Sequence, residues 1–249
     1  MKKIILMILI FAVYGCGSTH YYWPTTQNVP LFKEKNELMA SFGYNNLGNV
    51  NNLGFLDGFG FHTAYSITDH IACQFGYNSK SGNVNLDYAE VVELGFAYYL
   101  RYENYLAFET FGGYSYGMIK GDNYFYKTIA NFNRIYLQPS IGISSDYIDI
   151  AFTPRFSKVD YHIKENIVYH PSPDDEIIKN MDKNSYYFFE PGITVRLGFK
   201  YVKFQFQHIE VKKQNKDGLI FFPTSNSFSI LFYIPIKKKM TKWRPEFKK

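Results

Sequence analysis

The acidic residues and histidines are the side chains of this chain most able to do chemistry. Asp160 and His162 precede Asp174, Asp175 and Glu176, and carboxylates beside an imidazole can bind a cation or support acid–base hydrolysis. No metal-ligand spacing repeats in this stretch. The pattern is more typical of a solvated loop than of a catalytic or metal site.

A second group, His62, Ser66 and Glu93, has the residue types of an acyl hydrolase. His62 and Ser66 fall on one face of a strand, but their positions are roughly 13 Å apart along an extended chain. Direct contact is excluded, and a polar lining is the better interpretation. Zinc spacings, phosphate-binding glycine loops and nucleophile elbows are absent from the sequence, so we expect no enzyme and no metal.

Charged residues also occupy the polar faces of alternating segments. The chain is far richer in lysine than in arginine, yet Lys203 is the one lysine that falls clearly on such a face. Balanced carboxylates and guanidinium groups with small neighbours suit a narrow lumen, where charges must pair because little water is available. This predicts a lumen charge network of Glu93, Glu109, Arg134, Asp149, Arg155, Glu190, Arg196 and Lys203.

The segments that must position these charges are two-faced strands. The stretch Tyr186–Phe199 reads YYFFEPGITVRLGF, and its alternate residues separate into an apolar set and a small, polar and charged set. About ten segments alternate in this way. They are Glu37–Asn45, Phe55–Ile67, His70–Asn78, Tyr88–Arg101, Tyr105–Ile119, Asn131–Ser144, Tyr147–Lys158, Tyr186–Phe199, Tyr201–Glu210 and Ser225–Ile236.

The connections between these segments alternate in length. Tight ones at Thr68-Asp69, Tyr102–Asn104, Ser145-Asp146 and Lys200 alternate with longer ones at Leu47–Gly54, Ser79–Asp87, Lys120–Ala130, Val159–Ser185 and Val211–Thr224. Outer-membrane barrels have short periplasmic turns, long outside loops and an even strand number. We therefore predict an all-β, antiparallel up-and-down transmembrane barrel of about ten strands, with eight or twelve as alternatives and with periplasmic termini. Pro139, Pro154 and Pro191 predict bulges or local widening within it.

The first fifteen residues read as a secretory signal. Two lysines precede an apolar run that is too short to span a membrane, and Val13-Tyr14-Gly15-Cys16 resembles a bacterial lipobox. We expect Cys16 to carry a covalent lipid, which is the one attached group that the sequence predicts. The expected organisation is a signal peptide at 1–15, a lipid-anchored arm at 16–36, the barrel at 37–236 and a basic tail at 237–249.

With these features in view, the chain resembles a family of small outer-membrane β-barrel lipoproteins of Bacteroidota-type bacteria. The resemblance depends on Cys16, on Tyr22 with Pro24-Thr25, on Pro30-Leu31-Phe32 with Glu34-Lys35, and on Ala64–His70 at the first tight turn. It implies a fold and a location in the outer membrane, and it supplies no catalytic residue. Gly17–His20 lacks the acidic residues typical of surface-exported lipoproteins, which favours an anchor in the periplasmic leaflet.

Three classes of function fit this sequence. The favoured one is a non-enzymatic barrel with a structural or interaction role in the cell envelope, accessory to a larger complex. A small solute or ion channel and an outer-membrane enzyme acting on lipid or peptide are the alternatives, and the same alternation turned inside out would give a tethered soluble ligand-binding barrel. Outer-membrane lipid and other envelope proteins are the expected partners, and the mild positive charge gives no reason to expect nucleic acid.

Two further features remain open at this level. The apolar stretch Gly218–Pro223 and the aromatic stretch Asn123–Tyr126 fall in long loops. Such exposed stretches bind a partner or lipopolysaccharide, or they are strand extensions or aromatics at the membrane interface. If the arm emerged outside the cell, its roughly twenty residues, which reach about 65 Å when extended, could thread the lumen as a plug.

Overall fold

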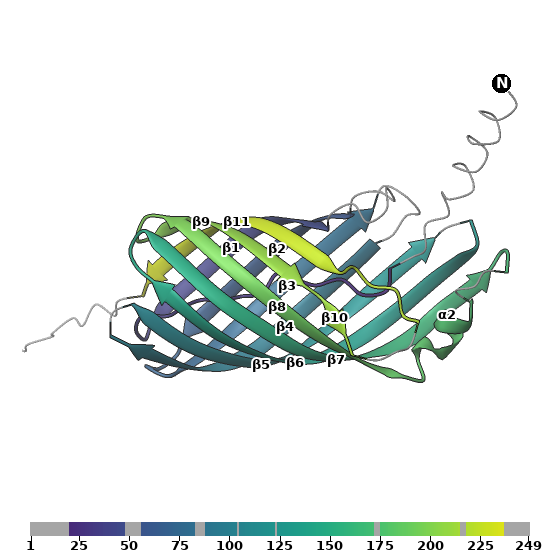
Figure 1. Ribbon diagram of the computed structural model, residues 1–249, viewed down its shortest axis with the longest axis horizontal. Helices are drawn as coiled ribbons and strands as arrows, with labels where there is room; N and C mark the ends of the chain where they lie inside the picture. The colour runs from purple at the N-terminus through teal and green to yellow at the C-terminus, as the bar shows by residue number, and fades with distance from the viewer. Residues whose placement is uncertain are drawn as a thin grey trace, which may run out of the picture.

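The computed structural model describes residues 20–47, 56–82, 88–103, 105–122, 124–171, 175–214 and 218–236. The predicted signal peptide, Cys16 and the basic tail at 237–249 lie outside the described residues. The described chain is a barrel with a single short helix at one end (Figure 1).

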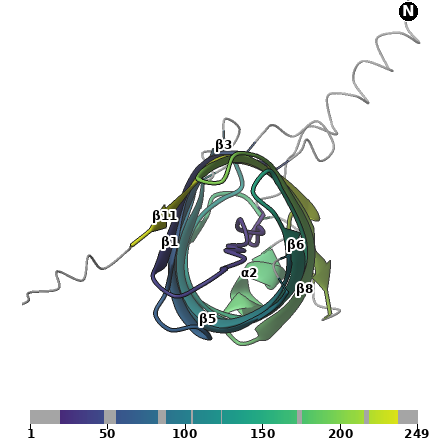
Figure 2. The ribbon, with the colours of Figure 1, turned by 90° about the vertical axis from the view of Figure 1, so that its left-hand side faces the viewer.

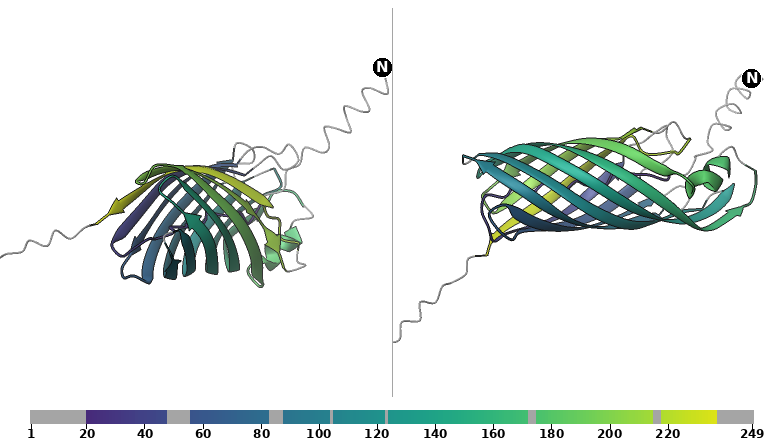
Figure 3. Two further views of the ribbon diagram at one scale, coloured as in Figure 1. Left: turned by 60° about the vertical axis from the view of Figure 1, so that its left-hand side comes forward. Right: turned by 90° about the horizontal axis from the view of Figure 1, so that it is seen from below.

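Eleven strands form one antiparallel sheet. They are β1 (Glu37–Leu47), β2 (Leu56–Ser66), β3 (Ile71–Gly82), β4 (Tyr88–Tyr102), β5 (Leu106–Asp122), β6 (Tyr126–Ser144), β7 (Ile148–Val168), β8 (Ser185–Gly198), β9 (Val202–Glu210), β10 (Lys212–Lys213) and β11 (Thr224–Pro235). The short β10 continues β9 along β8 in the same register, and β11 pairs with both β9 and β1. The wall is therefore a closed ring of ten strands, as predicted (Figure 3).

The two ends of the barrel differ in their connections. One end, here the tight-turn end, carries the short links between β2 and β3, β4 and β5, β6 and β7, and β8 and β9. It also holds the start of β1 and the end of β11, where the Ile236 N–H donates to the Asn36 carbonyl at 2.8 Å. The opposite end, the long-loop end, carries the longer connections and helix α2 (Asp175–Met181).

The outer face of the wall carries a band of exposed apolar side chains. On β7 the outward residues from Ile148 to Phe156 are exposed hydrophobics apart from the half-buried Pro154, and Phe96 and Phe204 are 69% and 65% exposed. Ile148–Phe156 has about the 9–11 residues with which a tilted strand crosses a bilayer. Aromatic side chains flank the tight-turn side of this band, including Tyr102, Tyr147, Phe199 and Tyr201. This arrangement contradicts the soluble ligand-binding barrel, whose apolar face would be inside.

Beyond the band the alternation inverts. Lys158 and Asp160 point outward from β7 and form an ion pair at 3.0 Å, whereas Val159 and Tyr161 point inward and are buried. The inversion explains where the predicted strand ends were wrong: β6 begins at Tyr126, and β7 continues to Val168 instead of ending at Lys158. A search for outward apolar residues misses strands whose outer face meets water.

The three prolines lie side by side on neighbouring strands. Pro154 pairs with Pro191, and the β6–β7 ladder is interrupted between Leu137 and Ile141, where Pro139 faces Pro154. The ladder resumes without a change of register, so the predicted bulges are wrong at these positions. The β6–β7 ladder shifts register at Ile129/Ala130 instead. The prolines are tolerated as a local gap in pairing rather than as inserted residues.

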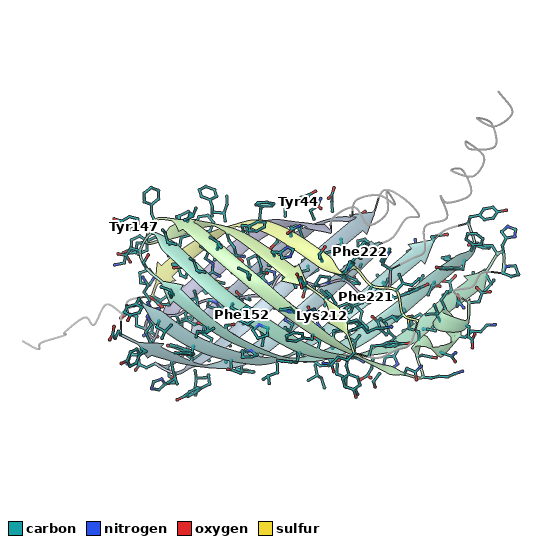
Figure 4. The ribbon with its side chains drawn as sticks, in the orientation of Figure 1. Tyr44, Tyr147, Phe152, Lys212, Phe221 and Phe222 are labelled. Carbon is teal, nitrogen blue, oxygen red and sulfur yellow. The ribbon has the colours of Figure 1, made fainter. Side chains whose placement is uncertain are left out.

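The apolar band predicts a strong penalty for a charge at its centre. Phe152 lies midway along the β7 part of the band, is 47% exposed and points outward (Figure 4). We expect Phe152→Arg to lower the free energy of unfolding in lipid vesicles by about 2–4 kcal/mol, because arginine at the bilayer midplane must be taken from water into hydrocarbon. The measurement is equilibrium urea unfolding followed by the gel mobility of the folded barrel.

His162→Arg is the matched control, since His162 lies on the same outward face of β7 beyond the band. A similar loss of stability for both variants would contradict the assignment of the band to lipid.

Candidate functional site

The lumen of the barrel is filled by the chain's own N-terminal arm. In Figure 2 the arm lies inside the ring of strands, and residues 21–32 are all buried. At the tight-turn end the Lys33 ammonium donates to Asp146 at 3.1 Å, and this hydrogen bond lowers the pKa of the Asp146 carboxyl. At the long-loop end the Tyr21 N–H donates to the Ile220 carbonyl at 2.9 Å. The arm therefore passes along the lumen from one end to the other.

The wall supplies hydrogen-bond partners for the arm's backbone. The arm has no regular secondary structure, so its buried N–H and C=O groups need other partners. Gln207 accepts from the Gln27 N–H at 2.8 Å and donates to the Gln27 carbonyl at 3.0 Å. Six more wall side chains donate to arm carbonyls: Lys80 to Pro24, Gln138 to Asn28, Arg196 to Val29, Tyr161 to Tyr21, Tyr233 to Pro30 and Arg101 to Leu31.

A charge cluster at the middle of the lumen is hydrogen-bonded to one hydroxyl group of the arm. Arg134 donates to Thr25 Oγ1 at 2.9 Å and Arg155 donates to it at 2.8 Å, while the hydroxyl donates to Glu93 at 3.2 Å. Glu93 forms ion pairs with both arginines. A hydroxyl has one hydrogen to donate and two lone pairs, so Thr25 uses its full capacity here. The arm thus completes a site that the wall leaves open.

A second charge cluster lies nearer the tight-turn end. Lys203 Nζ is 2.6 Å from Asp149 Oδ1, and Arg196 Nη1 is 3.7 Å from Asp149 Oδ2. Tyr233 accepts from Arg196 at 2.9 Å and donates to the arm at Pro30. The predicted pairing of lumen charges therefore holds for these three residues as well as for the Glu93 cluster.

Glu109 and Glu190 are satisfied differently from the prediction. Both are buried in the lumen, but among the described residues neither has a lysine or arginine nitrogen within 4.0 Å. Glu109 accepts from the Phe32 N–H at 2.9 Å. Glu190 accepts from the Tyr22 hydroxyl at 2.5 Å and from Ser157 at 2.7 Å. Arm donors replace the cations that we expected beside these two carboxylates.

A hydrophobic core surrounds the arm at the long-loop end. Tyr22 stacks on Phe188 with ring centroids 3.7 Å apart, and Trp23 meets Phe132 edge-on at 5.7 Å. The same cluster includes Tyr161, Ile178 of α2 and Leu219. The apolar stretch Gly218–Pro223 therefore folds inward over the arm, although Phe221 remains partly exposed (Figure 4).

Two glycines in the wall make room for the arm. A Cβ at Gly192 would lie 2.3 Å from the Gln27 Oε1 atom, and a Cβ at Gly142 would lie 2.9 Å from the Leu31 Cδ2 atom. A larger residue at either position would displace the arm. Gly112 and Gly113, in contrast, do not face it, and Gly113 accommodates the Tyr136 ring.

Ser66 and Glu93, two of the residues predicted for a hydrolase site, are each engaged by other partners. Ser66 Oγ accepts from the Glu37 N–H at 2.9 Å and donates to the Glu34 carbonyl at 2.8 Å, while Glu93 is engaged by the two arginines. Asp160 accepts from Ser185 and Lys158, and Asp174 lies outside the described residues. Among the residues that the structure covers, no cluster of three metal-ligating side chains occurs, and no helix is long and apolar enough to cross a membrane.

A cavity of about 100 Å³ remains between the arm and the wall at the tight-turn end. Its lining includes Lys33 and Lys203. Both lysines already bind carboxylates, Asp146 and Asp149 respectively. Glu34, Glu37 and Lys200 also line it, so the cavity presents charges of both signs.

No family model matches the sequence, and a search of curated proteins finds no match. Among solved structures, the barrel is similar to the translocator domain of the autotransporter NalP from Neisseria meningitidis. The match has 8% sequence identity and a TM-score of 0.45, and it covers 79% of this chain and 87% of that chain.

The hydrogen bonds of Thr25 predict that the stability of the barrel depends on a hydroxyl group at this position. Thr25→Val keeps the side-chain shape but leaves Arg134, Arg155 and Glu93 each without one hydrogen bond in a buried site. We expect a loss of about 3 kcal/mol or more in the free energy of unfolding, because hydrogen bonds to charged groups contribute about 1.5–3 kcal/mol each. Thr25→Ser keeps the hydroxyl and should recover most of this loss. Equal losses for the two variants would show that shape matters and the hydroxyl does not.

The Glu190 contacts predict a second difference in stability. Glu190→Ala removes the acceptor of Tyr22 and Ser157 and should lower the free energy of unfolding by about 1–3 kcal/mol. Glu176→Ala, in the first turn of α2, should cost less than about 1 kcal/mol because it removes only a helix-terminus charge. Urea unfolding of both variants in detergent micelles makes the comparison. Equal effects would indicate a wet, open lumen around Glu190.

Proposed function

We propose that this protein is a non-enzymatic outer-membrane barrel, anchored by a lipid on Cys16, with a structural or interaction role in the cell envelope as an accessory to a larger complex. The observation that carries the proposal is that the lumen is occupied by the arm. Six of the eight predicted lumen charges contact the arm directly: Glu93, Glu109, Arg134, Arg155, Glu190 and Arg196. Because these six charged groups bind the arm, they are not free to select a solute or to activate a substrate.

The apolar band and the two kinds of connection support an orientation in the outer membrane. Barrels of this type place tight turns in the periplasm and long loops outside. The extension of β6, β7 and α2 then projects from the cell surface, where Tyr124 is 71% exposed and Tyr169 is 49% exposed. Exposed aromatic side chains are frequent in contacts between proteins, and this extension is where we expect an envelope partner to bind.

A resting channel does not fit the filled lumen. The water path that a channel needs would pass Glu93, Arg155 and Arg196, which are at most 2% exposed and contact the arm or one another. We expect the full chain to give no stepwise conductance in planar bilayers. A variant that lacks residues 20–32 should give conductance steps, because its charged lumen would fill with water. Steps from the full chain at rest would favour the channel.

Loss of the protein should weaken the barrier of the outer membrane. Cells without it are expected to become more sensitive to detergents and large antibiotics, and the full chain should restore resistance. His62→Ala and His162→Ala should restore it equally well if no chemistry is involved. Failure of either variant, at normal protein level, would favour the outer-membrane enzyme.

A further inference from the structure

The path of the arm through the lumen determines at which end of the barrel the residues before His20 emerge. Asn36 is held at the tight-turn end, where its N–H donates to the Ser66 carbonyl at 2.8 Å. His20, at the other end of the arm, stacks on Phe222 with ring centroids 3.9 Å apart. The start and the end of the arm therefore lie at opposite ends of the barrel.

The position of the arm at the long-loop end is fixed by several independent contacts. Tyr22 is bound on both sides: its backbone accepts from the Phe222 N–H at 2.9 Å and its hydroxyl donates to Glu190. A parallel bridge joins Tyr22 to Phe221, and the core around Trp23 lies directly beneath. This end of the arm is therefore packed into the folded structure at the long-loop end of the barrel.

We propose that the residues before His20, with the lipidated Cys16, lie at the cell surface, and that the lipid enters the outer leaflet. This inference rests on the orientation given under the proposed function. An extended chain spans at most about 3.6 Å per residue, so Cys16 reaches about 14 Å from His20. The hydrocarbon core is about 30 Å thick. From the long-loop end the periplasmic leaflet is out of reach, whereas the outer leaflet lies on the same side of the membrane.

The outer leaflet replaces the periplasmic leaflet that the sequence led us to expect. The lack of acidic residues in Gly17–His20 favoured the periplasmic leaflet, but that argument treated the arm as a short tether beside the tight turns. The arm instead runs through the lumen from Asn36 at the tight-turn end to His20 at the long-loop end. The tether between His20 and Cys16 therefore starts at the long-loop end. The barrel itself carries its N-terminal end across the membrane.

Labelling with a membrane-impermeant maleimide tests this placement in intact cells. The background is Cys73→Ser, since Cys73 is a free cysteine on the outer face of β3. Ser18→Cys reports on the residues before His20, Tyr124→Cys on the long-loop end and Asp69→Cys on an exposed tight turn. Thr19→Cys serves as a second reporter if Ser18→Cys does not show the gel mobility of a folded barrel.

We expect Ser18→Cys to be labelled in intact cells to the same extent as Tyr124→Cys, and Asp69→Cys to be labelled only after the cells are opened. Labelling of Tyr124→Cys without Ser18→Cys would overturn the inference and leave the proposed orientation intact. Labelling of Asp69→Cys without Tyr124→Cys would overturn the orientation and the inference together. Loss of metabolic lipid labelling in Cys16→Ser separately verifies the anchor.

Discussion

The requirement that every buried backbone polar group find a partner governs this structure. An irregular chain inside a narrow lumen exposes its N–H and C=O groups to surroundings that contain little water, and each one left unpaired costs free energy. The wall meets this requirement with long side chains such as Gln138, Arg196 and Gln207, each aimed at one arm residue. The polar lumen is therefore best understood as a binding site for the chain's own arm.

The same requirement explains why the lumen charges tolerate burial. A buried ion pair alone gains little, because desolvation offsets the attraction between the charges. Here Thr25, Gln138 and Tyr233 accept further hydrogen bonds from the arginines, and so satisfy guanidinium N–H groups that the ion pairs leave over. The arm and the charges depend on each other.

Alternation along single strands made the wall predictable from sequence, down to which side chains face inward. Glu93, Arg134, Asp149 and Arg196 were assigned to the lumen because a strand turns successive residues to opposite faces. The extension at the long-loop end was missed because Val159 and Tyr161 reverse that alternation. From the sequence, the arm was expected to fill the lumen only if it emerged outside the cell. Thr25 and Gln27 give no stronger signal, because they lie in no periodic pattern and their partners are distant in sequence.

The threaded arm also determines how the molecule resists force. A pull on the chain before His20, directed away from the long-loop end, passes along the arm to Asn36 and acts on the first residues of β1. The ladder hydrogen bonds of β1 with β2 and β11 are perpendicular to the strand, so a force parallel to β1 loads them together in shear. The whole wall can thus hold a load attached at one end of the chain.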